Sequence, residues 1–226
     1  MKGEASGGKK VLDPQRRHWE DTFVENPDLY GLEPSYSAKR AAEFFRTENK
    51  REILELGGGQ GRDALFFAKS GFRVRVIDYT EKGVHDITTR ARESGLTSES
   101  IRAIQHDVRE KLPFDNQSFD GCYSHMLYSM ALTTKELESL SREIWRILRH
   151  SGLNLYTVRN TNDSHYEKGI HRGEDMYEVD GFIVHFFSRD KVTHLAKGYE
   201  IIEIEEFKEG SLPRNLFLVA QRKKQN

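Results

Sequence analysis

The stretch ELGGGQGRDALFFA, residues 55–68, places four glycines between an apolar run and a helical pattern. The run REILEL (51–56) before it is typical of a buried strand. Residues 63–70 after it have a helical pattern, and Gly71 is positioned to end that helix. A glycine-rich turn between a strand and a helix allows a ligand to approach the backbone closely. The stretch therefore predicts a ligand-binding loop.

The spacing of the glycines argues against the two common phosphate-binding loops. A P-loop requires a glycine directly before its Lys-Ser or Lys-Thr pair, but Ala68 stands before Lys69. A dinucleotide fingerprint that starts at Gly57 and Gly59 requires a third glycine where Arg62 stands. The pattern is GxGxG preceded by an acid, Glu55. Such a turn suits a ribose with a compact zwitterionic tail, because the acid can meet a positive amino group.

The rest of the chain alternates strand and helix patterns. Strands are predicted at 72–78, 100–107, 118–125 and 153–159, and helices at 37–47, from Thr80 to about Ser94, and from a Thr133–Glu136 capping box. Ser188 caps a further helix, and 199–207 and 215–222 form a hairpin. This order predicts an α/β fold with a Rossmann-like, doubly wound, seven-stranded and mostly parallel sheet that ends in a C-terminal antiparallel hairpin. Ligands bind such sheets at the carboxyl ends of the strands.

Composition limits the class of protein. The chain has 226 residues and a formal net charge of −1, so nucleic acid is an unlikely partner by charge. One cysteine, Cys122, excludes an intrachain disulfide and favours a cytoplasmic protein. No apolar run approaches the ~20 residues of a membrane span, and no signal peptide is evident. We expect a disordered tail at 1–13 and a single domain at 14–226. The sequence gives no indication of an oligomeric state.

The ordered motifs resemble those of class I S-adenosylmethionine-dependent methyltransferases. ELGGGQG is similar to their first motif, VIDYT to their second and QHDV to their third, while LPFDNQSFDGCYSH resembles their fourth-strand region. The resemblance covers about residues 50–160 and the terminal hairpin. It implies that S-adenosylmethionine is the cofactor and S-adenosylhomocysteine the product. The implied cofactor-binding residues are Glu55, Gly57, Gly59, Gly61, Asp63, Asp78, Tyr79, Asp107 and Val108.

The resemblance implies a specific cofactor contact for two of these acids. Each of them could instead have a purely structural role. Asp78 would accept hydrogen bonds from both ribose hydroxyls, and Asp107 would bind the adenine amino group while Val108 packs on the ring. Alternatively, Asp78 is a helix-capping acid and Asp107 an ordinary loop acid. The family reaction is an in-line displacement at the methyl carbon, in which the protein aligns the nucleophile and excludes water.

Three segments are expected to form the acceptor pocket. The N-terminal segment 14–47 supplies Trp19, Tyr30 and Tyr36 and could fold over the site as a lid. The end of the fourth strand supplies His125, Met126 and Tyr128, and His125 and Tyr128 are the catalytic candidates. The insertion 160–187 follows the end of a strand, where Arg159, His165 and His171 could bind the acceptor. His125 is equally compatible with a packed, hydrogen-bonded histidine.

The sequence lacks the motifs of several methyltransferase classes, which argues against their acceptors. SHML replaces the [DNS]PP[FY] motif of amino-methyltransferases of adenine or glutamine, and Cys122 follows Gly121 rather than a proline, as cytosine C5 enzymes require. The arrangement WEDTF…YGLEPS before the glycines is similar to small-molecule methyltransferases of the tellurite-resistance and thiopurine type. We expect a small-molecule acceptor. The alternatives are an RNA or protein methyltransferase, or a non-catalytic S-adenosylmethionine-binding protein.

Three histidines raise the question of a metal. His165, His171 and His185 fall in or near the same insertion, and neutral imidazoles bind transition metals. Their spacing matches no metal motif. We therefore expect no metal site.

Overall fold

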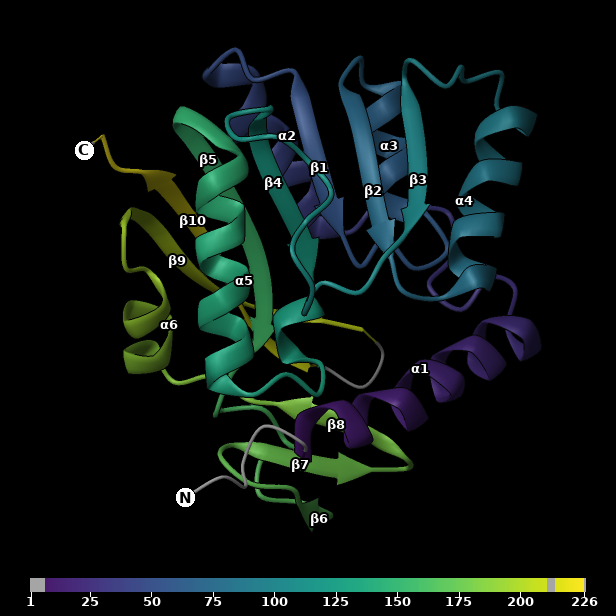
Figure 1. Ribbon diagram of the computed structural model, residues 1–226. Coiled ribbons are helices and arrows are strands. Elements are labelled where there is room, and N and C mark those ends of the chain that lie inside the picture. Colours follow the sequence, from purple (N-terminus) through teal and green to yellow (C-terminus); the bar gives the residue numbers. More distant parts are fainter. Residues whose placement is uncertain (1–6, 211–213, 226) are drawn as a thin grey trace.

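A computed structural model describes residues 7–210 and 214–225, and its centre is the predicted seven-stranded sheet (Figure 1). The strand order is β3-β2-β1-β4-β5-β10-β9. The first five strands are parallel, and β10 is antiparallel to both β5 and β9. The bounds are β1 (Glu52–Leu56), β2 (Arg73–Asp78), β3 (Ile101–Gln105), β4 (Phe119–His125), β5 (Leu148–Arg159), β9 (Tyr199–Glu209) and β10 (Arg214–Lys223). The predicted fold class is confirmed, and strand order reverses between β1 and β4.

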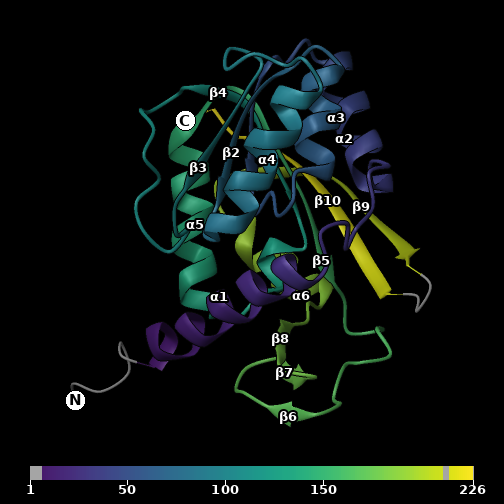
Figure 2. The ribbon, with the colours of Figure 1, turned by 90° about the vertical axis from the view of Figure 1, so that its right-hand side faces the viewer.

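Helices cover both faces of the sheet (Figures 1 and 2). One core packs α2 (Tyr36–Thr47), α3 (Arg62–Lys69) and α4 (Glu81–Glu93) against the sheet, and it includes Phe45 and Phe67. The other core packs α5 (Thr134–Ile147) and α6 (Arg189–Leu195), and it includes Leu137 and Ile144. Two buried layers fix the sheet, so the carboxyl ends of its strands are held in place.

The predicted elements are close to the observed ones, with one clear difference at β5. The Thr133–Glu136 capping box at the start of α5 is present, as predicted. However, β5 begins at Leu148, directly after α5, rather than at Leu153. The register between β4 and β5 shifts after Phe119, and Ser151 has a φ of 56°. The chain therefore continues as a strand through Gly152, with a bulge there instead of a separate turn before the strand.

The first helix begins earlier in the chain than the sequence suggests. Helix α1 spans Gly7–Glu25 and contains Pro14 within it, so it begins inside the segment 1–13 that is expected to be a disordered tail. The expectation for residues 1–6 lies outside the described residues. Glycines disfavour helix in isolation, so tertiary contacts farther along α1 outweigh local preference.

The insertion 160–187 contains a small antiparallel sheet against which α1 packs. Its strands are β6 (Ile170–His171), β7 (Met176–Val179) and β8 (Phe182–His185). Gln15 donates a hydrogen bond to the Gly181 carbonyl and accepts one from the amide of Ile183. The Trp19 ring lies 4.7 Å from that of Phe182. Figure 2 shows α1 running beside β8 below the carboxyl ends of the parallel strands.

Candidate active site

The glycine loop turns sharply between β1 and α3. Gly59 has a φ of +52° and donates its amide to Asp78 Oδ2 at 2.7 Å. Gly61, the residue before α3, has a φ of +88°, and a Cβ there would lie 2.8 Å from Ile87. Positive φ and close packing both require glycine at this position. The loop thus exposes its backbone at the strand switch point.

Asp78 has a double role at the end of β2. Besides the Gly59 bond, its Oδ1 accepts hydrogen bonds from the amide and hydroxyl of Thr80 at 2.9 and 2.6 Å. Thr80 in turn caps α4 by accepting the amide of Gly83. Burial raises the pKa of Asp78, and these three hydrogen bonds oppose that rise. Asp78 therefore braces the glycine loop and also faces the cavity beside it.

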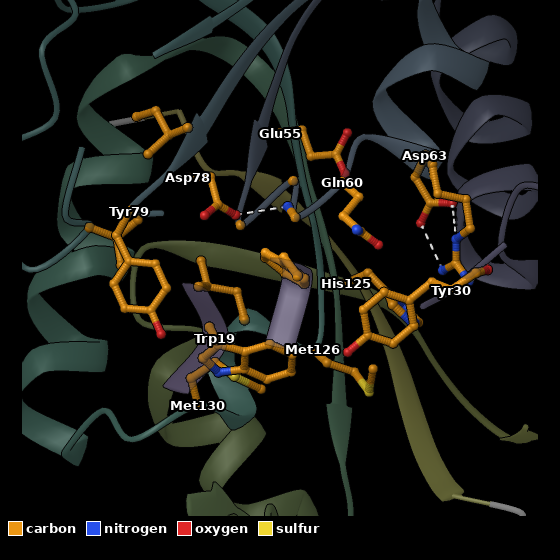
Figure 3. A pocket seen from close by; sticks show the side chains of 18 of the residues that line it. Trp19, Tyr30, Glu55, Gln60, Asp63, Asp78, Tyr79, His125, Met126 and Met130 are labelled. Atoms are coloured by element: carbon orange, nitrogen blue, oxygen red, sulfur yellow. Dashed lines mark hydrogen bonds and ion pairs between the residues drawn. The ribbon is translucent and has the colours of Figure 1, made fainter. Parts of the chain in front are cut away.

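A cavity of about 1060 Å³, its open mouth included, lies over the carboxyl ends of β1, β2 and β4. Its lining is mostly apolar, with polar groups gathered from the glycine loop and the strand ends. Figure 3 shows Glu55 and Asp78 near one another, with Tyr30, His125 and Met126 toward the other side. The lining residues are Trp19, Phe23, Tyr30, Gly31, Glu55, Gly57, Gly58, Gly59, Gln60, Arg62, Asp63, Ile77, Asp78, Tyr79, His106, Asp107, Val108, His125, Met126, Leu127, Met130 and Leu132.

Glu55 places an unmatched carboxyl at this cavity. The residue is 3% exposed, and its Oε2 has no hydrogen-bond partner within the described residues. Burial raises the pKa of Glu55 well above its ordinary value, and the negative charges of Asp63 and Asp78 add to the rise. A buried carboxyl without a partner is costly when ionised. A positively charged ligand group would relieve that cost, and the site is built to receive one.

The third predicted motif also lies at the cavity. Asp107 accepts hydrogen bonds from the amide and guanidinium of Arg109, with Nε 3.0 Å from each carboxylate oxygen. Burial would raise the pKa of Asp107, but the hydrogen bonds and charge of Arg109 lower it overall. Tyr79 and Val108 lie beside it along the lining. Asp107 is therefore a charged carboxylate already oriented by Arg109.

Helix α1 roofs the cavity. Trp19 and Phe23 line the side of the cavity that faces α1. The Phe23 ring lies so close to Gly59 that a side chain added there would touch it. The carboxylate of Glu20 accepts the amides of Glu81 and Lys82 at the start of α4. α1 is therefore attached to the core of the fold as well as to β8.

The segment after α1 is attached to the glycine loop. Gln60 is buried, accepts the amide of Leu29 and donates to the carbonyl of Asn26. This contact holds the chain that carries Tyr30 beside the loop. The sequence analysis missed Gln60 because a glutamine between glycines carries no signal of its own.

His125 lines the cavity together with Tyr30 and Met126, and both of its ring nitrogens contact polar groups. Its Nδ1 lies 3.0 Å from the hydroxyls of Ser37 and Thr157. Its Nε2 lies 3.0 Å from Glu209 Oε2. The sequence analysis did not name Glu209, because only the antiparallel hairpin brings the end of β9 to the end of β4.

A buried polar network continues from His125 to α3. Tyr123 donates to Asp63 Oδ2, and Ser35 donates to the same carboxylate through its amide and its hydroxyl. Arg62 adds an ion pair at 3.0 Å. Burial would raise the pKa of Asp63, but the charges of Arg62 and His125 and the Ser35 bonds keep it low. Asp63 thus lines the cavity as a fully satisfied carboxylate.

Several candidate residues lie away from the cavity. Tyr128 belongs to η1 (Leu127–Ser129), is 1% exposed and stacks on Tyr156 at 4.3 Å, so its ring is packed in the core. Tyr36 is 43% exposed and binds Glu205. Arg159 is committed to Asp163 and to His165 Nδ1, while exposed His171 binds the Glu174 carbonyl. Among candidates outside the glycine loop, Trp19, Tyr30, His125 and Met126 do line the cavity.

The histidines of the insertion have separate partners. His185 is buried, donates Nδ1–H to the Leu132 carbonyl at 2.6 Å and accepts from Lys191 at Nε2. Burial lowers the pKa of His185 to about 4, and the charge of Lys191 adds to this. Within residues 7–210 and 214–225, no group of three His, Cys, Asp or Glu side chains is arranged to hold a metal ion.

We compared the sequence with families of known proteins. Residues 53–152 match the family described as a methyltransferase domain. The segment that carries the glycine loop and the ends of β2 and β4 is therefore similar to a methyltransferase domain. A protein from Geobacillus sp. (strain WCH70), named only as a candidate methyltransferase, is 29% identical over 146 residues, which cover 64% of this chain. That match spans just over half, 56%, of the relative's length.

Solved structures of methyltransferases share the fold. The 1,6-didemethyltoxoflavin-N1-methyltransferase of Burkholderia thailandensis, solved with its substrate and S-adenosylhomocysteine, superposes with a TM-score of 0.73 and 15% identity. The match covers 100% of this chain and 94% of that one. TehB from Haemophilus influenzae gives 0.67 and 17% identity over 91% of this chain and 67% of that one. At these identities the similarity establishes the fold.

Solved structures that share this fold hold S-adenosylmethionine or S-adenosylhomocysteine, and the residues of the site fit this cofactor. The unpartnered Oε2 of Glu55 matches a buried cationic amino group. Asp78 and Asp107 line the same cavity at the ends of neighbouring strands β2 and β3. Within the described residues, no helix has the length and apolar character that crossing a membrane demands.

Proposed function

We propose that this methyltransferase transfers the methyl group of S-adenosylmethionine to a small-molecule acceptor by in-line displacement. The proposal rests on one observation: the same cavity, covered by α1, is lined by Glu55 and Asp78 and also by Tyr30, His125 and Met126. We expect the cofactor to bind at the first two residues and the acceptor at the other three. Because one cavity is lined from both ends, a cofactor held at Glu55 and Asp78 would face an acceptor held at Tyr30 and Met126.

The chain's own residues would hold the cofactor at three points. Glu55 would pair with its amino group, and Asp78, whose Oδ2 takes one hydrogen bond from Gly59, has lone-pair capacity left for the ribose. Asp107 would accept from the adenine amino group while Val108 packs on the ring. When bound, S-adenosylmethionine supplies a methyl group on a sulfonium leaving group.

The remaining task of the protein is alignment and exclusion of water. The roof of α1 supports this role, because Trp19 and Phe23 cover the cavity with apolar rings. Tyr30, Met126 and Met130 would position the acceptor opposite the sulfur. A helix attached to the insertion through Gln15 and to α4 through Glu20 covers the cavity, which suits a small acceptor better than a folded RNA or protein that would need an open groove.

Transfer of labelled methyl groups to defined acceptors tests the proposal. The purified protein would be given methyl-labelled S-adenosylmethionine with thiols, phenols, tellurite, selenite, iodide, bulk RNA and bulk protein in separate reactions. We expect label in a small acceptor. Label in RNA or protein would instead support the macromolecular alternative. Tight cofactor binding without any transfer would support a non-catalytic binding protein.

A further inference from the structure

The hydrogen bonds around His125 fix which of its nitrogens carries the proton. Thr157 Oγ1 accepts the amide of Met126 at 2.9 Å, so its hydroxyl proton is free to point at His125 Nδ1, 3.0 Å away. Nδ1 then acts as an acceptor. His125 Nε2, 3.0 Å from the carboxylate of Glu209, is the donor. Neither ring nitrogen therefore offers a lone pair to the cavity.

Glu209, unlike His125, has an oxygen lone pair that could accept a proton. It is the last residue of β9, and its side chain is one-fifth exposed. Its Oε2 accepts from His125, and within the described residues no hydrogen bond joins its Oε1 to another group. The charged and polar groups that face it are His125 from β4, Arg62 and Asp63 from α3, Tyr30, and Arg214, its partner across the β9–β10 pairing. His125, Arg62, Asp63 and Tyr30 line the cavity, and Glu209 borders it from behind them without being one of the lining residues.

We propose that the carboxylate of Glu209 takes the proton from the acceptor's nucleophilic atom, and that His125 is the positioning residue that holds this carboxylate in place. This inference rests on the proposed function and adds a substrate class to it. A built-in proton acceptor is useful only when the nucleophile enters protonated. The acceptor is therefore a hydroxyl, thiol or N–H compound rather than a preformed anion such as iodide.

The step balances without any further reagent. A lone pair of the acceptor atom forms the bond to the methyl carbon, and the carbon–sulfur bond breaks with its electron pair remaining on sulfur. The proton of the acceptor atom passes to Glu209 Oε1 and then to solvent at the mouth of the cavity. Nothing is oxidised or reduced, and loss of the proton restores the carboxylate.

The charge environment keeps Glu209 ready for this role. Burial would raise its pKa, but the hydrogen bond from His125 and the charge of Arg62 hold the pKa below its ordinary value despite the nearby charge of Asp63. Glu209 is therefore ionised throughout the neutral range. Even a weak base suffices, because the acidity of the acceptor proton increases steeply as the new carbon bond forms.

The first test uses the protonation of His125 itself. In ¹⁵N-histidine-labelled protein, NMR should show His125 protonated at Nε2 and unprotonated at Nδ1 near neutral pH. Glu209→Gln should change the His125 nitrogen shifts, whereas Glu203→Gln, on the same strand and paired only with Arg40, should leave them unchanged. An unprotonated Nε2 in the wild-type protein would overturn the proposal, because His125 would then be the available base.

The second test uses methyl transfer to a series of substituted phenols and thiophenols. Wild-type and Glu203→Gln rates should be nearly flat from about pH 6 to pH 9. Glu209→Gln should lose about 10²–10⁴-fold with weakly acidic phenols. Its remaining rate should rise about tenfold per pH unit as the acceptor ionises, and acidic thiophenols should be spared. Equal behaviour of the two variants would overturn the role of Glu209. Loss of transfer by the wild-type protein would instead overturn the proposed function.

Discussion

Glu55 shows how a single buried carboxyl can prepare a site for a cationic ligand. Its folded-state pKa is raised above its unfolded value by burial and by Asp63 and Asp78. The folded protein therefore binds this proton more tightly than the unfolded chain does. The resulting stability is complete below the unfolded pKa and is lost as the pH rises toward the folded pKa. At neutral pH, Glu55 weakens the ligand-free protein.

Glu55→Gln removes this titration while keeping the shape of the side chain. We expect the variant's melting temperature, relative to wild type, to rise as the pH is raised from about 4.5 toward 7. Its affinity for S-adenosylmethionine should fall, because the partner of the amino group is lost. Thermal unfolding across this pH range and calorimetric titration measure the two effects. A pH-independent difference in melting temperature would contradict the raised pKa of Glu55.

Asp78→Ala tests the second contact of the cofactor. The change removes the bonds proposed for the ribose and leaves the amides of Gly59 and Thr80 without their carboxylate. We expect binding of S-adenosylmethionine to weaken by about 1–3 kcal/mol. Asp115→Ala, in the exposed loop before β4, is a matched control. Calorimetry that gave the wild-type affinity for Asp78→Ala would refute the assignment of Asp78.

Among the elements, α1 decides how the cavity is closed. It is attached at Gln15 to the insertion and at Glu20 to the start of α4. A carboxylate at a helix N-terminus binds free amides and meets the positive end of the helix dipole. These two attachments hold Trp19 over the cofactor end of the cavity. Exchange of the cofactor should therefore depend on release of α1.

Glu20→Ala should loosen this roof. We expect S-adenosylhomocysteine to dissociate several-fold faster in stopped-flow measurements, since the attachment is worth about 1 kcal/mol. Asp21→Ala changes a neighbouring acid whose partner, Arg17, is exposed, and it should retain the wild-type rate. Equal dissociation rates for wild type and Glu20→Ala would show that α1 does not control exchange.

The elements also show which parts of the fold local sequence can predict. β1, the glycine loop and α3 follow from one short stretch, since apolar runs, positive φ and a capped helix are local properties. The extent of α1 could not be predicted locally, because its packing against the β7–β8 hairpin involves residues more than 160 positions away. The early start of β5 was missed because a bulge depends on pairing with β4.

At the scale of the whole molecule, the cofactor end was predictable and the acceptor end was only partly so. Glu55, Asp78 and Asp107 stand at the ends of strands whose order is set by the alternating pattern, and all three line the cavity. Glu209 is 84 positions from His125, and only the antiparallel pairing of β9 and β10 brings them together. Arg159 and His171 were expected at the acceptor because the insertion follows β5, but their side chains bind within the insertion itself.

The most direct test of the account uses a cell extract as the source of acceptor. The protein and methyl-labelled S-adenosylmethionine would be incubated with extract, and the label would then be separated by ultrafiltration into small molecules and macromolecules, with volatile products trapped. The account predicts label in the small-molecule or volatile fraction, and its loss with Asp78→Ala. Label confined to protein or RNA would contradict a small-molecule methyltransferase.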